Sequence, residues 1–178
     1  MAWSTTPRKV LVAYSKEDKK EAQEFIQFFA HRLVGFTPIL IEMEEDLLYA
    51  GCPAYDLFPV RAPFLKDSEV TLVLLGKNTY RQKYIDRIIE ASLEHGDFAP
   101  NGLLGVALPS VKDGALLPIR LRLNCDRDAG KSYAQYLPHP NSLVSLGEHI
   151  DDAVRARKER LHLINNPEIL LQRGCRMH

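Results

Sequence analysis

Short apolar runs alternate with amphipathic segments along most of the chain. The apolar runs lie at residues 9–14, 38–43, 69–75 and 103–108. Continuous apolar runs of this length are typical of strands that are buried on both faces of a parallel sheet. A segment long enough for a helical crossover separates each run from the next, as parallel pairing requires. The pattern therefore predicts four parallel strands in one sheet.

Apolar residues spaced three and four positions apart predict the helices between these strands. The spacing indicates helices over about residues 17–33 and 83–95. A last long helix is predicted to begin at a cap formed by Asn141 or Ser142 and to end near Asn165. Each predicted helix carries charged residues opposite its apolar side, so we expect it to cover one face of the sheet.

Two segments are harder to assign. Residues 56–66 have apolar positions at helical spacing, but Pro59 and Pro63 interrupt them, so we expect a short or broken helix. Residues 118–123 alternate arginine with apolar side chains. An alternation of this kind predicts a fifth, short strand at the edge of the sheet.

This order of elements predicts an α/β fold with a parallel sheet of about five strands and helices on both faces. The 178 residues suit a single domain, with a core over about residues 9–163 and a C-terminal tail over 164–178. No internal repeat or linker divides the chain. In sheets of this type, ligands bind beyond the carboxyl ends of the strands, so we expect the functional residues there.

Composition and charge exclude several classes of protein. Lys plus Arg equals Asp plus Glu at 23 each, so the formal net charge is zero. A dedicated nucleic-acid binder usually carries a basic excess, and an anionic membrane attracts basic segments, so neither partner is predicted. No apolar run is long enough to span a bilayer. The three cysteines are widely spaced, which predicts no zinc site and a reducing, cytoplasmic location.

The common catalytic motifs are absent from the sequence. It contains no G-x-G-x-x-G, no G-x-S-x-G and no H-E-x-x-H, and its six histidines do not cluster at ligand spacing. We therefore predict no metal site and no bound cofactor. What remains is a set of polar residues at the predicted strand ends, including Ser15, Glu45, Asp46 and Thr79.

These strand-end residues have two interpretations. Carboxylates that accept from ribose hydroxyls, together with backbone N–H groups at helix starts, suit a nucleotide. Alternatively, Ser15 only caps the following helix, and the acidic residues 42–46 form a solvated turn. Spacing alone does not decide between the two.

The sequence resembles a known family at three places. Residues 9–18, KVLVAYSKED, are similar to the first strand and loop of TIR-like domains. Residues 68–86, SEVTLVLLGKNTYRQKYID, resemble the central segment of the bacterial TIR-like family that includes the Thoeris antiphage sensor. Residues 102–109, GLLGVALP, and then 118–121, PIRL, with Asn124, resemble its "G-L-L-G-x-x-L-P … P-x-R-L-x-x-N" tail.

The resemblance implies a flavodoxin-like, TIR-type fold with a nucleotide pocket at the strand ends. Many such proteins cleave NAD between nicotinamide and ribose, and Thoeris members make an ADP-ribose or cyclic ADP-ribose type signal that activates an effector protein. It implies NAD as ligand or substrate, an effector partner and self-association. The residues expected to contact the nucleotide are Tyr14, Ser15, Asp18, Glu45, Asp46, Thr79 and Tyr84.

The chain departs from the family at the catalytic position. The family helix reads Trp-Val-x-x-Glu-Ile, and the matching stretch here begins at Tyr84, which places Ile88 at the glutamate. Asp86 and Glu90 are each two residues away, about 200° around the helix. Two alternatives stay open: an inactive adaptor or assembly module, or an enzyme with Glu90 as a relocated acid. The apolar stripe favours Ile88 in the core and a solvated Glu90 with an ordinary pKa.

Overall fold

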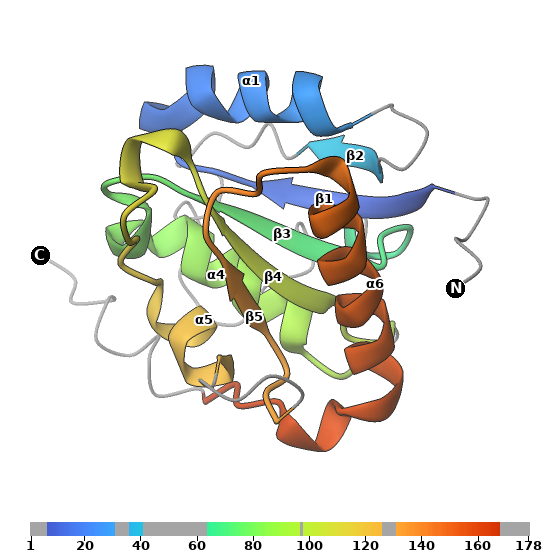
Figure 1. The fold of residues 1–178 in the computed structure, drawn as a ribbon. Coiled ribbons are helices and arrows are strands. Elements are labelled where there is room, and N and C mark those ends of the chain that lie inside the picture. The colour runs from blue at the N-terminus through green and yellow to red at the C-terminus, as the bar shows by residue number, and fades with distance from the viewer. Residues whose placement is uncertain (1–6, 31–35, 41–63, 97, 126–130, 168–178) are drawn as a thin grey trace, which may run out of the picture.

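The computed structural model describes residues 7–30, 36–40, 64–96, 98–125 and 131–167. Its centre is a five-stranded sheet whose strands are all parallel (Figure 1). The strands are β1 (Arg8–Ala13), β2 (Phe36–Leu40), β3 (Val70–Leu75), β4 (Gly102–Ala107) and β5 (Gln135–Leu137). The sheet order is β2-β1-β3-β4-β5.

The four strands predicted from the apolar runs are confirmed. β1 pairs with β3 in parallel, with Val10 opposite Val70, and β3 pairs with β4 in parallel, with Val70 opposite Gly102. Every residue of β3 and β4 is buried, as the continuous apolar runs predicted. All four strands therefore end at the same edge of the sheet, which is where ligands bind in folds of this class.

Helices cover both faces of the sheet (Figure 1). They are α1 (Lys19–Phe29), α4 (Lys83–Leu93), α5 (Ile119–Asn124) and α6 (Leu143–Glu159). Single 3₁₀ turns precede α1 (η1, Lys16–Asp18) and α4 (η3, Thr79–Arg81), and others follow β4 (η4, Pro109–Val111) and α6 (η5, Leu161–Leu163). The predicted cap of the last helix is present, because the Ser142 hydroxyl accepts from the Ser145 amide at 3.1 Å.

Each face of the sheet has its own hydrophobic core. On one face, α1 and α6 pack on alternate side chains of the strands, such as Val10, Leu72 and Val106. On the other face, α4 and α5 pack on the intervening side chains, such as Leu11 and Val73. The fold is thus a three-layer α/β arrangement of the flavodoxin type, as predicted.

The prediction of an edge strand over residues 118–123 is wrong. This segment forms the short helix α5, and the fifth strand is β5 farther along the chain. The buried residues of α5 are Arg120, Leu121 and Asn124, a helical spacing. The alternating pattern is misleading because an edge strand would expose Arg120 to solvent, whereas Arg120 is fully buried. Leu121 packs so closely on β4 that a Cβ on Gly105 would lie 2.6 Å from it.

Several other sequence predictions fall partly outside the described residues. Most of the predicted broken helix 56–66 does, and so do residues 41–43 of the second predicted strand. The predicted helix 17–33 is seen as η1 followed by α1, which ends at Phe29, while residues 31–33 lie outside the described residues; the predicted helix 83–95 is seen as α4.

Candidate functional site

Five of the predicted site residues lie at the carboxyl ends of β1 and β3. Tyr14 and Ser15 follow β1, Asp18 ends η1, Thr79 begins η3, and Tyr84 lies in the first turn of α4. We call these five residues the strand-end cluster. Hydrogen bonds between them join segments that are distant in the sequence, so the fold brings them together.

Thr79 is the centre of the strand-end cluster. Its hydroxyl is fully buried, accepts from the Gly76 amide at 2.8 Å and donates to Oδ2 of Asp18 at 3.2 Å. Gly76 leaves room for this arrangement, since a Cβ there would lie 2.1 Å from the same Asp18 oxygen. The loop after β1 and the loop after β3 are therefore held together through one hydroxyl and one carboxylate.

The Asp18 carboxylate is the acidic group of the strand-end cluster. Burial raises the pKa of Asp18, the hydrogen bond from Thr79 opposes that rise, and repulsion by Glu21 and Glu17 adds to it. Asp18 is only partly buried, so the carboxylate keeps contact with solvent. A carboxylate in this position can accept hydrogen bonds from a ribose hydroxyl, which is the role predicted for it.

Tyr84 connects the start of α4 to the end of β1. Its hydroxyl donates to the Tyr14 carbonyl at 3.1 Å and accepts from the Lys16 amide at 3.1 Å. Only 8% of Tyr84 is exposed. The hydroxyl group of Tyr84 thus bonds to the backbone of the loop after β1, and its aromatic ring is part of the core beneath the strand ends.

Ser15 lies at the first position before η1, as predicted. It is buried, and its carbonyl accepts from the Asp18 amide at 2.9 Å, but its side chain makes no capping hydrogen bond. Neighbouring loops are joined by further contacts, because Asn78 donates to Glu17 at 2.8 Å and the Ser110 amide donates to Glu21 at 3.1 Å. Carboxylates of η1 and α1 thus reach the loops after β3 and β4.

Glu45 and Asp46, the other two predicted nucleotide contacts, lie outside the described residues. Their approach to Ser15 and Thr79 therefore stays a prediction. Among the described residues, no group of three or more His, Cys, Asp or Glu side chains is arranged to hold a metal ion.

Ile88, at the family's glutamate position, lies in the hydrophobic core. It is 2% exposed and packs in the core on the α4 side of the sheet, together with Ile85 and Ile89. The apolar stripe therefore does set the rotation of α4, as the sequence indicated. A side chain here contacts the sheet and offers no charged or polar atom.

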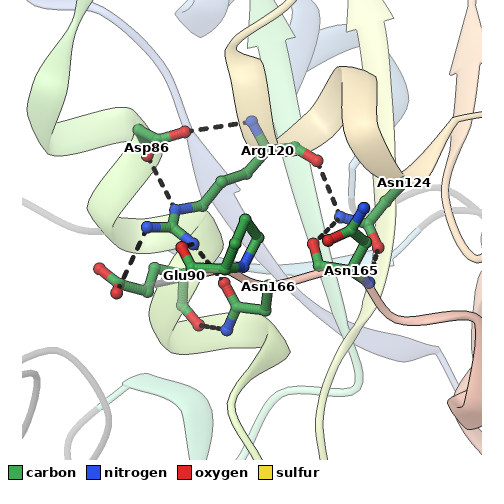
Figure 2. A network of polar contacts seen from close by, with 7 residues as sticks. Asp86, Glu90, Arg120, Asn124, Asn165 and Asn166 are labelled. Carbon is green, nitrogen blue, oxygen red and sulfur yellow. Dashed lines mark hydrogen bonds and ion pairs between the residues drawn. The ribbon is translucent and has the colours of Figure 1, made fainter. Parts of the chain in front are cut away.

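The expectation of a solvated Glu90 with an ordinary pKa is wrong. Glu90 is 7% exposed, and its carboxylate lies 3.4 Å from Nη2 of Arg120 (Figure 2). Burial raises the pKa of Glu90 to about 6, although Arg120 and Arg87 lower it. The side of α4 that carries Glu90 is buried because α5 packs against it.

Glu90 does not lie at the strand ends. It is six residues after Tyr84, which corresponds to about 9 Å along the helix axis, toward the opposite edge of the sheet. Its carboxylate contacts Arg120 on α5. The relocated-acid hypothesis predicted a Glu90 that lines the strand-end cleft beside Ser15, and the observed position does not match that geometry.

Sequence reasoning missed the residues around Glu90. Arg120 is fully buried, donates through Nε to Asp86 at 2.8 Å and reaches Asn166 and Pro167 through Nη1 (Figure 2). The signal was present in the "P-x-R-L-x-x-N" motif, whose arginine and asparagine are four residues apart and so share one side of a helix.

Comparison with known families supports the sequence resemblance. Residues 12–113, more than half of the chain, match the family described as "Thoeris protein ThsB, TIR-like domain". The chain belongs to this family. Membership gives this TIR-like domain a signalling role in antiphage defence. A search of curated proteins found no match.

The matched region of the TIR-like domain contains the strand-end cluster, Ile88 and Glu90, whereas Arg120 and everything after it lie beyond the match. No helix in the described part of the chain has the length and apolar character needed to cross a membrane.

Proposed function

We propose that this TIR-like domain recognises NAD or a related nucleotide at the strand-end cluster and signals to an effector protein without cleaving the nucleotide. The observation that carries the proposal is the burial of Ile88, at 2% exposure, where the family has its glutamate. Self-association of the domain and a cytoplasmic location belong to the same proposal, on the basis of the resemblance alone.

Cleavage of the nicotinamide–ribose bond needs a carboxylate near the sugar. The reaction passes through an oxocarbenium-like centre, which a carboxylate stabilises while nicotinamide leaves. Ile88 supplies no charge, and its neighbours in the core are apolar. Asp18 is the carboxylate of the strand-end cluster, and it accepts from Thr79, so it suits binding of a hydroxyl better than attack at the sugar.

The edge of the sheet supports nucleotide recognition. Parallel α/β sheets bind nucleotides beyond the carboxyl ends of their strands, and the strand-end cluster lies there. The cluster is held by hydrogen bonds of 2.8–3.2 Å between β1, η1, η3 and α4, so its shape exists before a ligand binds. We include Glu45 and Asp46 in the proposed site as sequence-based predictions.

A second candidate function is NAD cleavage with Glu90 as a relocated acid. Two observations favour it: burial raises the pKa of Glu90 to about 6, and one carboxylate oxygen, Oε2, is buried without a hydrogen-bond partner in the described part of the chain. Perturbed, incompletely paired acids are enriched at functional sites. This function requires Glu90 to leave Arg120 and a substrate to reach the middle of α4.

Nicotinamide release distinguishes the two functions. Purified wild-type protein is incubated with NAD, and free nicotinamide and bound NAD are measured on the same sample. We expect binding without release. Release that Glu90→Gln abolishes and Glu24→Gln preserves would establish the second function, because Glu24 is an exposed residue of α1. Release that survives Glu90→Gln would contradict both and place the acid elsewhere. Absence of NAD binding would overturn the recognition proposal.

A further inference from the structure

Residues 164–167, which we call the C-terminal strap, are held on α5 by side chains. Asn124 uses both atoms of its amide: Nδ2 donates to the Asn165 carbonyl, and Oδ1 accepts from the Asn165 amide, each at 2.8 Å. The side-chain amide of Asn124 thus makes the same two hydrogen bonds to the Asn165 backbone that a neighbouring strand would make. A segment without helix or strand of its own is therefore fixed by one buried asparagine (Figure 2).

The strap also covers the charged groups between α4 and α5. Arg120 donates through Nη1 to the Asn166 side chain and to the Pro167 carbonyl, the latter at 3.1 Å. Asn166 in turn donates to the Glu90 carbonyl at 3.1 Å. We call Asp86, Glu90 and Arg120 the Arg120 cluster. The strap bonds to this cluster through neutral groups only, the Asn166 side chain and the Pro167 carbonyl.

The Arg120 cluster is incompletely satisfied. It contains two carboxylates and one guanidinium, so a negative charge is in excess when both acids are ionised. Nη2 of Arg120 and Oε2 of Glu90 are buried, and neither has a hydrogen-bond partner among the residues that the structure describes. A buried charged atom without a hydrogen-bond partner has a desolvation cost, and a hydrogen bond to water would remove much of that cost. Displacement of the strap is the local change that would admit water to them.

We propose that the C-terminal strap opens and closes locally over the Arg120 cluster, and that ionisation of Glu90 favours the open position. This inference goes beyond the proposed function. It concerns the position of the chain after α6 and does not depend on whether NAD binds.

The balance of charges around Glu90 gives the direction of the effect. Arg120 on α5 and Arg87 on α4 favour the ionised form, whereas Asp86 and Glu94 on α4 oppose it, and the strap adds no charge. Burial outweighs the arginines and raises the pKa of Glu90 to about 6, against an ordinary value of 4.5. If opening restores the ordinary value, the opening equilibrium rises about 30-fold as pH increases from below 4.5 to above 6.

The Asn165 amide reports strap closure directly. Its hydrogen is bonded to Oδ1 of Asn124 only when the strap is closed. Amide hydrogen exchange is measured on the full chain between pH 4.5 and 7, and each rate is divided by the intrinsic rate of an unprotected amide at that pH. We expect protection of Asn165 to fall by about 15-fold across this range, because part of the full change lies below pH 4.5.

Two variants separate the proposal from a general effect of pH. Glu90→Gln should make the protection of Asn165 independent of pH, and the surface variant Glu24→Gln should behave as wild type. The proposal is overturned by pH-independent protection in wild type, or by the same fall in Glu90→Gln. It is also overturned if Asn165 exchanges as slowly as Leu104 in the central strand β4, since the strap would then open only with global unfolding, or if Asn165 shows no protection.

Discussion

The strand-end cluster and the Arg120 cluster lie near α4 and use polar residues in different ways. In the strand-end cluster, one carboxylate, one hydroxyl and one phenol bond to each other or to loop backbone at 2.8–3.2 Å. In the Arg120 cluster, three ionisable groups meet, and two of their buried atoms find no hydrogen-bond partner within the described ranges of the chain. The first is a hydrogen-bonded network, and the second is a buried group of charges in which carboxylates outnumber the guanidinium.

This difference indicates where the molecule is rigid and where it can change. Opening a network whose polar groups are hydrogen-bonded would break those bonds without relieving an unpaired charge. The strand-end cluster should therefore keep its shape over a wide pH range. A buried group of charges is sensitive to the removal or neutralisation of any member.

Removal of Arg120 should have the largest effect. Arg120→Ala leaves Asp86 and Glu90 as like charges without their buried ion-pair partner and also removes the bonds to Asn166 and Pro167. Breaking a buried ion pair in this way costs about 3–5 kcal/mol. Denaturant unfolding measures the loss. The matched control Arg122→Ala, an exposed position on the same helix, should change stability by less than about 0.5 kcal/mol.

The pH dependence of stability should depend on Glu90. Its folded-state pKa of about 6 lies above the ordinary 4.5, so its contribution is fully present below pH 4.5 and is lost as pH rises through 6. The difference amounts to about 2 kcal/mol. Unfolding free energies of wild type and Glu90→Gln, measured from pH 4.5 to 7, should diverge accordingly. Parallel curves would show that Glu90 is not desolvated as described.

Loss of one hydroxyl in the strand-end cluster should have the smallest effect on stability. Thr79→Val keeps the shape but leaves the Gly76 amide without its acceptor and Asp18 without its donor. A buried, unsatisfied donor costs about 1–3 kcal/mol. Thr79→Ser, which keeps the hydroxyl, should recover most of that loss. Equal unfolding midpoints for the two variants would show that the hydroxyl is not important to the cluster.

Much of the fold was predictable from the sequence because its three central strands, β1, β3 and β4, are buried almost throughout. Residues 70–75 contain one polar residue, Thr71, so their assignment needed no knowledge of their neighbours. Parallel topology then placed Ser15 and Thr79 at one edge of the sheet. The partners of Tyr84, by contrast, are backbone groups of Tyr14 and Lys16, and such bonds leave no pattern in the sequence.

The Arg120 cluster could not be predicted because its burial depends on elements that are distant in the chain. Arginine usually faces solvent, so the alternating pattern predicted an edge strand where α5 lies. With no helix predicted beside α4, Glu90 was expected to be exposed. In the structure, α5 and the strap bury Arg120 and Glu90 together. Pairing with Asp86 and Glu90 is what permits an arginine to lie at 0% exposure.

The most direct test of nucleotide recognition is the change in backbone amide resonances when NAD is added to the labelled full chain. We expect concentration-dependent shifts at Ser15, Asp18, Gly76 and Thr79, with little change at Asn124 and Asn165, and no nicotinamide released in the same sample. No shift at the strand-end residues, or shifts confined to the surroundings of Arg120, would contradict it.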